Sequence, residues 1–181
     1  MDELWQRALD HLDEGNFTRL EDLLGGPDGF DRQIVDWFDD GRFNDEPSAF
    51  AEAFTCACML GRVKVAEHLL DNGVDPYAGM KTGLSGFHYA ASGARLDIVK
   101  LLIDRRVPME IKGMYDNTVW DQALWSAVNE HREDHAAVIE ALLEAGAVIK
   151  PGTFEWWDRQ NVPSAKTKAK VANALRRHAA R

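Results

Sequence analysis

A run of helix-forming sequence recurs along this chain at a nearly fixed interval, and this periodicity constrains the fold more than any other feature. Residues 61–75 (GRVKVAEHLLDNGVD) align without a gap with residues 94–108 (ARLDIVKLLIDRRVP), at an offset of 33 residues. A third copy occupies residues 136–147, and a weaker copy occupies residues 15–24. Each copy has apolar residues at helical spacing but is too short to bury its apolar face alone. The sequence therefore predicts helical units that stack on one another.

Short motifs mark the start and the end of these units. Three stretches are similar at the start, in falling order of similarity: residues 85–91 (SGFHYAA), 118–124 (TVWDQAL) and 52–58 (EAFTCAC). Two are similar at the end: residues 69–75 (LLDNGVD) and 142–147 (LLEAGA). With a period of 33 and two helices per unit, they resemble the ankyrin repeat, which opens with T-P-L-H-x-A-A and ends with L-L-x-x-G-A. The resemblance covers residues 1–150, is strongest over 50–150, and extends to bacterial ankyrin-repeat proteins.

This resemblance implies an all-α fold, a short ankyrin-type α-solenoid of about four helix-pair repeats with a C-terminal capping helix. We expect a single domain over residues 1–181. Its expected parts are an N-terminal capping repeat (1–24), an insertion (25–50), three repeats (51–80, 83–113 and 116–150) and a C-terminal cap (151–181). Within the insertion, residues 31–38 are amphipathic and predict an added helix, flanked by turn-rich segments.

Charge is distributed unevenly along the chain. The whole sequence carries a formal net charge of −9, whereas residues 1–50 are strongly acidic and residues 151–181 are basic. A negative surface repels nucleic acid and anionic lipid, so we expect neither as a partner. No apolar run is long enough to span a membrane, and the acidic start of the chain is unlike a secretory signal. With two cysteines, Cys56 and Cys58, too badly placed to pair with each other, we expect a reduced, cytoplasmic monomer.

Residues with catalytic chemistry are few. The string HREDH contains His131, Glu133 and His135, and two histidines four apart on a helix can share a metal ion. No third ligand accompanies them, and the string lies in a seven-residue insertion, so a solvated loop is the preferred interpretation. His88 occupies the position of the ankyrin histidine, and the resemblance implies a structural role in which its imidazole ties the turn to neighbouring repeats by hydrogen bonds. We therefore predict no enzymatic activity and no cofactor.

The phase of the repeats indicates which residues face the concave groove of such a fold. These positions include Met59, Leu60, Lys81, Leu84, Tyr115, Asn117 and Trp125. Five of the seven are apolar or aromatic, and apolar patches with aromatic anchors mark interaction sites. The alternative is that segment 25–50 folds over part of the groove and covers Met59 and Leu60.

These observations predict a protein–protein interaction module that binds its partner through the groove and the finger-like turns between units. The acidic first 50 residues favour a partner with a basic surface. A concrete version is a stoichiometric inhibitor, or an immunity-like antidote, of a cationic toxin or nuclease. The alternative functions are a small-molecule site near Trp120 and Trp125 and a metal-dependent activity at His131 and His135.

Overall fold

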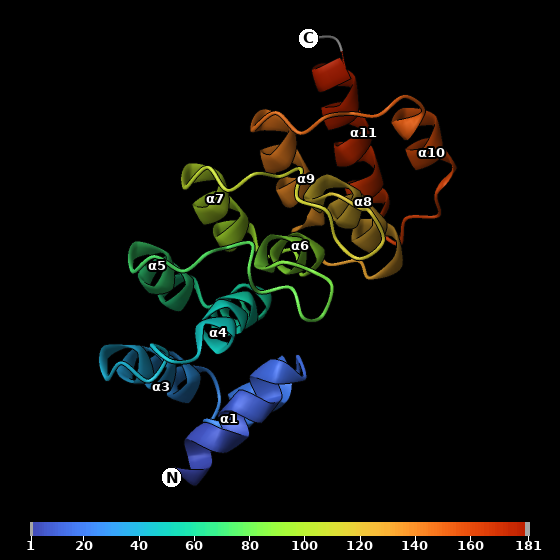
Figure 1. Cartoon of the computed structure of the whole chain (residues 1–181). Helices are drawn as coiled ribbons and strands as arrows, with labels where there is room; N and C mark the ends of the chain where they lie inside the picture. Colours follow the sequence, from blue (N-terminus) through green and yellow to red (C-terminus); the bar gives the residue numbers. More distant parts are fainter. Residues whose placement is uncertain (1, 180–181) are drawn as a thin grey trace. The chain divides into compact units, whose positions relative to one another are not determined.

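The computed structural model describes residues 2–179 of the chain, which form eleven α-helices and no strand. The prediction of an all-α fold of ankyrin type is confirmed. The chain divides into two compact units, Met1–Tyr89 and Ala90–Arg181. The boundary falls inside helix α6 (Gly86–Ser92), which the sequence assigns to one repeat. Figure 1 labels the helices of the first unit from α1 (blue) to α5 (green) and those of the second from α7 (yellow-green) to α11 (red).

The first unit has two layers of helices. Its helices are α1 (Glu3–Asp13), α2 (Phe17–Leu23), α3 (Pro27–Asp39), α4 (Pro47–Leu60) and α5 (Val63–Asp71). The first helices of two successive repeats, α1 and α4, pack against each other. The second helices, α2 and α5, both contact α3, the helix predicted within the insertion. The inserted helix therefore joins the second-helix layer, whereas Met59 and Leu60 lie at the end of α4 and are half-buried.

Local signals in the sequence explain where helices of this unit begin and end. The Asp2 carboxylate accepts the backbone N–H of Leu4 at 3.1 Å and so caps α1. Pro47 stands in the first turn of α4, where its missing N–H costs nothing. Gly61 ends α4 with a left-handed backbone, at a φ of 78°, which glycine adopts without strain.

Aromatic side chains fasten the insertion to the repeats beside it. The ring of Trp5 on α1 meets Trp37 and Phe43 edge to face, with ring centroids 4.9 and 5.2 Å apart. The ring of Phe38 on α3 meets the imidazole of His68 on α5 edge to face, with ring centroids 5.3 Å apart. Such pairs add to the stability gained by burying their area. The insertion is thus an integral part of the first unit.

The second unit continues the pattern of paired helices. Its helices are α7 (Leu96–Asp104), α8 (Val119–Asn129), α9 (His135–Glu144), α10 (Thr153–Arg159) and α11 (Ala165–Ala179). Helix α9 packs against α7, α8 and α11, and α10 packs against α11. The indole N–H of the buried Trp157 donates to the carbonyl of Lys168 at 3.1 Å, which joins α10 to α11.

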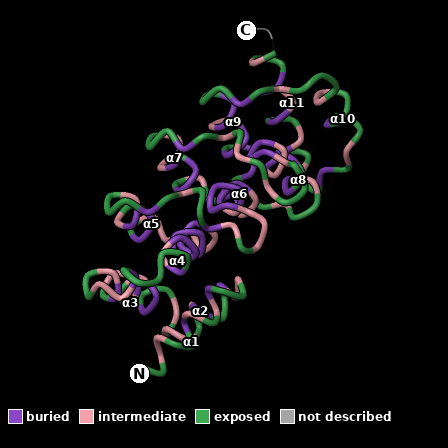
Figure 2. Tube along the Cα trace, viewed as in Figure 1, coloured by how far each residue is buried: buried purple, intermediate pink, exposed green. Residues whose placement is uncertain are grey.

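Burial is most complete along α4, whose trace is purple in Figure 2. Residues 51–58 of α4 are all buried, including the free cysteines Cys56 and Cys58. Burial raises the pKa of both thiols, which keeps them protonated and unreactive. Within residues 2–179, no helix is both long enough and apolar enough to cross a membrane.

Candidate functional site

The finger loop before α8 is a closed turn that presents an aromatic side chain. The Gly113 N–H donates to the carbonyl of Asn117 at 2.9 Å, and the Asp116 N–H donates to the carbonyl of Gly113 at 3.0 Å. Tyr115 lies in this turn and is 77% exposed, beside the exposed Met114. The turn therefore fixes the backbone on which Tyr115 is displayed.

Helix α8 separates its two tryptophans by face. Trp120 is 1% exposed and belongs to the core, whereas Trp125 is 48% exposed. Exposing half of an indole forfeits much of the stability that its burial would provide, so the position is typical of an interaction site. Trp125 thus lies on the surface, and its predicted place in a concave groove stays a prediction.

A line of hydrogen bonds runs from the finger loop along α8. The Asn117 amide donates to the Gln122 side chain at 2.7 Å, and the Gln122 amide donates to the Ser126 hydroxyl at 3.3 Å. The Ser126 hydroxyl also bonds the hydroxyl of Ser92 at 2.9 Å. These bonds hold the predicted site residue Asn117 in place, half-buried between the loop and the helix.

The start of α8 is tied to the next finger loop as well. Thr118 and Asp121 form a capping box: the Asp121 carboxylate accepts the Thr118 N–H, and the Thr118 hydroxyl accepts the Asp121 N–H. Lys150 donates to the Asp121 carboxylate at 2.6 Å. Burial alone would raise the pKa of Asp121, but the hydrogen bonds from Lys150 and Thr118 outweigh it and lower that pKa. Two successive finger loops therefore meet at one carboxylate.

The other predicted site residues belong to the first unit. Met59, Leu60 and Leu84 are half-buried, and Lys81 is exposed in the loop between α5 and α6. The structure describes the two units separately, so the apolar stripe across the repeats stays a prediction.

The loop that carries Lys81 is anchored on α4. The Thr55 hydroxyl donates to the carbonyl of Gly79 at 2.8 Å, and the Lys81 N–H donates to the Glu52 carboxylate at 2.8 Å. A Cβ on Gly79 would lie 2.2 Å from the Thr55 hydroxyl and 2.4 Å from the carbonyl oxygen of Ala51. Only glycine lets the loop approach the helix so closely.

Glu52 and the pocket in front of it were not predicted from the sequence. Glu52 is 1% exposed and lines a cavity of about 260 Å³ together with Asp10, Asp13, Glu46 and Lys81. Burial raises the pKa of Glu52, and the hydrogen bond from Lys81 opposes that rise. The available signal was a lone carboxylate in the otherwise apolar run of α4, PSAFAEAFTCACML.

His88 makes a local hydrogen bond in its own turn, and the implied tie to neighbouring repeats stays a prediction. His88 is buried, and its Nδ1 lies 2.8 Å from the hydroxyl of Ser85, the residue directly before α6. The Ser85 hydroxyl also accepts the backbone N–H of His88 at 3.4 Å. The pair therefore stabilises the first turn of α6.

The metal-site alternative at His131 and His135 is wrong in its geometry. His135 is buried: its Nδ1 accepts the Arg132 N–H at 2.8 Å, and its Nε2 donates to the carbonyl of Ser92 at 2.9 Å. His131 Nε2 bonds the Thr167 hydroxyl at 2.9 Å. Both ring nitrogens of His135 are thus in use. No group of three or more potential ligands that could hold a metal ion occurs among residues 2–179.

Residues 132–134 of this string are exposed, in line with a solvated loop, and the same contacts correct that expectation for the buried His135. Burial lowers the pKa of His135, and the hydrogen bond to Ser92 opposes that effect. A neutral imidazole is also what the two hydrogen bonds require, because Nδ1 must accept while Nε2 donates. His135 is therefore a structural residue that joins the start of α9 to the end of α6.

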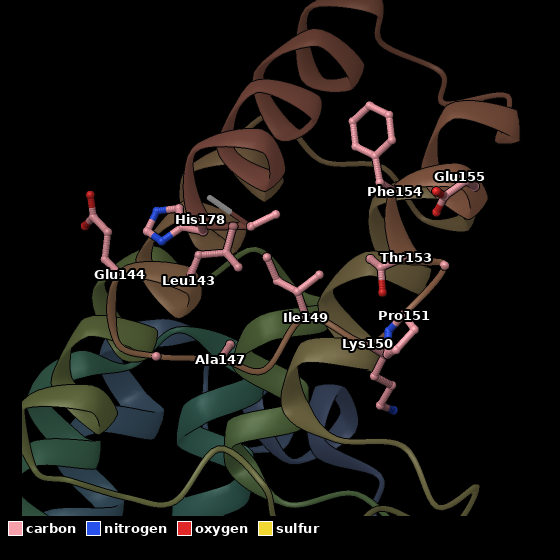
Figure 3. Close-up of a pocket in the computed structure, with 13 residues that line it drawn as sticks. Leu143, Glu144, Ala147, Ile149, Lys150, Pro151, Thr153, Phe154, Glu155 and His178 are labelled. Carbon is pink, nitrogen blue, oxygen red and sulfur yellow. The ribbon is translucent and has the colours of Figure 1, made fainter. Parts of the chain in front are cut away.

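A small-molecule site shared by Trp120 and Trp125 has no geometric basis, because one is in the core and the other on the surface. A separate cavity of about 690 Å³ lies between the finger loop after α9 and the C-terminal helices. Figure 3 shows Phe154 from α10 and His178 from α11 among its walls, with Ile149 from the loop. Neither tryptophan lines this cavity.

Paired helices joined by finger loops define a helical repeat protein. Comparison with known protein families matches residues 54–152 to ankyrin repeats, in three copies. The chain belongs to the ankyrin-repeat family. A search of curated proteins found no match. Ankyrin repeats generally mediate protein–protein interaction and are typically modules without enzymatic activity.

Proposed function

We propose that this protein binds a protein partner through its finger loops and the exposed faces of its first helices. The observation that carries the proposal is the exposure of Tyr115 and Trp125 on a scaffold that hydrogen bonds hold rigid. Large aromatic side chains lose little conformational entropy on binding and dominate the energy of many interfaces. A rigid backbone beneath them lowers the entropic cost of binding further.

The charge of the chain supports a partner with a basic surface. The net charge is −9, and the acidic residues are concentrated in the first 50 positions. An acidic field accelerates encounter with a basic protein and disfavours acidic partners. A stoichiometric inhibitor of a cationic toxin or nuclease fits this charge, with the protein acting as a cytoplasmic monomer that binds neither nucleic acid nor membranes.

The test is to replace both exposed aromatic residues, Tyr115→Ala and Trp125→Ala, and to capture partners from the native lysate. We expect the double variant to lose the partner that the wild-type protein recovers, because truncating an aromatic anchor costs about 2 kcal/mol or more. Trp156→Ala is the matched control, since Trp156 is also an exposed tryptophan but lies on α10. Recovery of the same partner in equal amount by the double variant would show that the surface is assigned wrongly.

A further inference from the structure

The first unit contains an acidic pocket between two first helices and a finger loop. Its volume is about 260 Å³. Asp10 and Asp13 come from α1, and Lys81 comes from the loop after α5. Glu46 directly precedes α4, and Glu52 lies on it. Four carboxylates thus face one ammonium group, and the excess negative charge favours a cationic ligand.

Glu52 supplies an observation independent of the charge count. It is 1% exposed, and one carboxylate oxygen, Oε1, accepts the Lys81 N–H at 2.8 Å. The other oxygen, Oε2, is buried and has no hydrogen-bond partner within residues 2–179. A buried carboxylate oxygen without a donor is costly, and a ligand that brings a donor removes that cost. The pocket is therefore short of a donor as well as of positive charge.

A metal ion does not fit this shortage. Among the described residues, no set of three or more carboxylates, histidines or cysteines lies close enough together to hold one. The carboxylates are instead spread around the pocket, which suits a larger organic cation with several N–H donors. A guanidinium group is planar and has five donors, so it can serve more than one carboxylate, whereas an ammonium group is a compact point charge.

We propose that this pocket receives an arginine side chain of the protein partner, with Glu52 and Asp10 as its carboxylate acceptors. This inference rests on the proposed function and names the chemistry that the basic partner would present in the first unit. The wall of the pocket that carries Lys81 is held in place, because hydrogen bonds to Thr55 and Glu52 fix this loop on α4.

Lys81 acts as a resident competitor for the arginine. Its ammonium group pairs with Asp13 at the pocket, and both side chains are well exposed, so water weakens the pair. An incoming guanidinium displaces this ammonium from the carboxylates. The Glu52 hydrogen bond comes from the backbone of Lys81 and survives when the side chain is removed. Lys81→Ala therefore clears the pocket without untying the loop.

The test is an NMR titration of the ¹⁵N-labelled full chain with N-acetyl-arginine amide, compared with its neutral citrulline and its lysine counterparts. The reporter is the Lys81 amide, whose N–H points at Glu52. We expect saturable shifts at Lys81 and along α1 with the arginine probe, and weaker binding of the other two. Glu52→Gln and Asp10→Asn should each weaken the arginine probe about fivefold, and Lys81→Ala should tighten it by a similar factor.

Asp22→Asn is the matched control, because Asp22 is an exposed carboxylate on α2 that does not line the pocket. Equal shifts with the citrulline probe, equal affinity for the lysine probe, or weaker binding after Lys81→Ala would each overturn the proposal. So would affinities in Glu52→Gln and Asp10→Asn that match the Asp22→Asn control. The Asp10→Asn variant guards against unfolding in Glu52→Gln, because Asp10 is exposed whereas Glu52 is buried.

Capture of the partner separates this inference from the proposed function. If the pocket variants bind the partner as the wild type does while Tyr115→Ala with Trp125→Ala loses it, the arginine site is wrong and the protein-binding function stands. If the arginine probe binds as described while the aromatic double variant keeps the partner, the pocket stands and the finger surface is wrong.

Discussion

Single residues in this chain show how one side-chain type serves different ends. Trp120 and Trp125 lie five positions apart on α8, yet one fills the core and the other faces solvent. Glu52 is a carboxylate within a run of eight consecutive buried residues of α4. The repeat phase predicted the exposure of Trp125. It did not reveal Glu52, because a hydrogen bond from a loop 29 residues away stabilises its burial.

His135 gives the first prediction at this scale. Replacing His135 by alanine removes the hydrogen bonds that its ring makes to the Ser92 carbonyl and the Arg132 N–H. The free energy of unfolding should fall by about 2 kcal/mol or more. Urea unfolding at neutral pH measures the loss. His131→Ala is the control, since His131 is half-buried and bonds only the Thr167 hydroxyl among the contacts described, and it should cost less. Equal losses would contradict the structural role of His135.

The same residue sets part of the pH dependence of stability. Burial lowers the pKa of His135 below its ordinary value of 6.5, so the unfolded chain takes up a proton at a higher pH than the folded chain does. Stability is therefore retained above pH 6.5 and falls as the pH drops through the lowered pKa. In His135→Gln this decline should be smaller than in the wild type, as urea midpoints measured across the range will show.

At the scale of elements, most helices could be predicted from the sequence because short motifs mark the start and the end of the repeats. The helix predicted at residues 31–38 is α3, Pro27–Asp39, and the first helix of the chain is α1, Glu3–Asp13. What could not be predicted is the layer in which α3 packs. That depends on aromatic contacts such as Trp5 with Trp37, which are remote in sequence.

The loop between α5 and α6, which carries Gly79 and Lys81, should depend on its close contact with α4. Gly79→Ala would place a Cβ against the Thr55 hydroxyl and the Ala51 carbonyl, so the loop must move off the helix. We expect a loss of about 1–3 kcal/mol in urea unfolding and faster amide exchange at Lys81. Gly73→Ala is the control: it has a positive φ of 84° but open space around it, so it should cost only about 1 kcal/mol. Unchanged exchange at Lys81 in Gly79→Ala would refute this anchoring.

At the scale of the whole molecule, the repeats supply the scaffold and the departures from regularity supply the candidate binding surfaces. The best-formed motif, residues 85–91, contributes the structural His88, whereas the exposed Tyr115 and Trp125 belong to the next, less regular repeat. The sequence predicted the fold because the fold follows the repeat phase, whereas the binding role of Tyr115 and Trp125 stays a prediction. It could not predict the Glu52 pocket, which arises where three segments of the chain meet.

The central claim, that finger loops and first-helix faces bind a protein partner, is tested most directly by amide hydrogen exchange of the chain alone and in complex with its purified partner. Binding slows the exchange of amides that an interface covers. The account predicts slower exchange in residues 109–129, which include Tyr115 and Trp125, and in the loop around Lys81. Protection confined to α3 and α11, with no change in these segments, would contradict it.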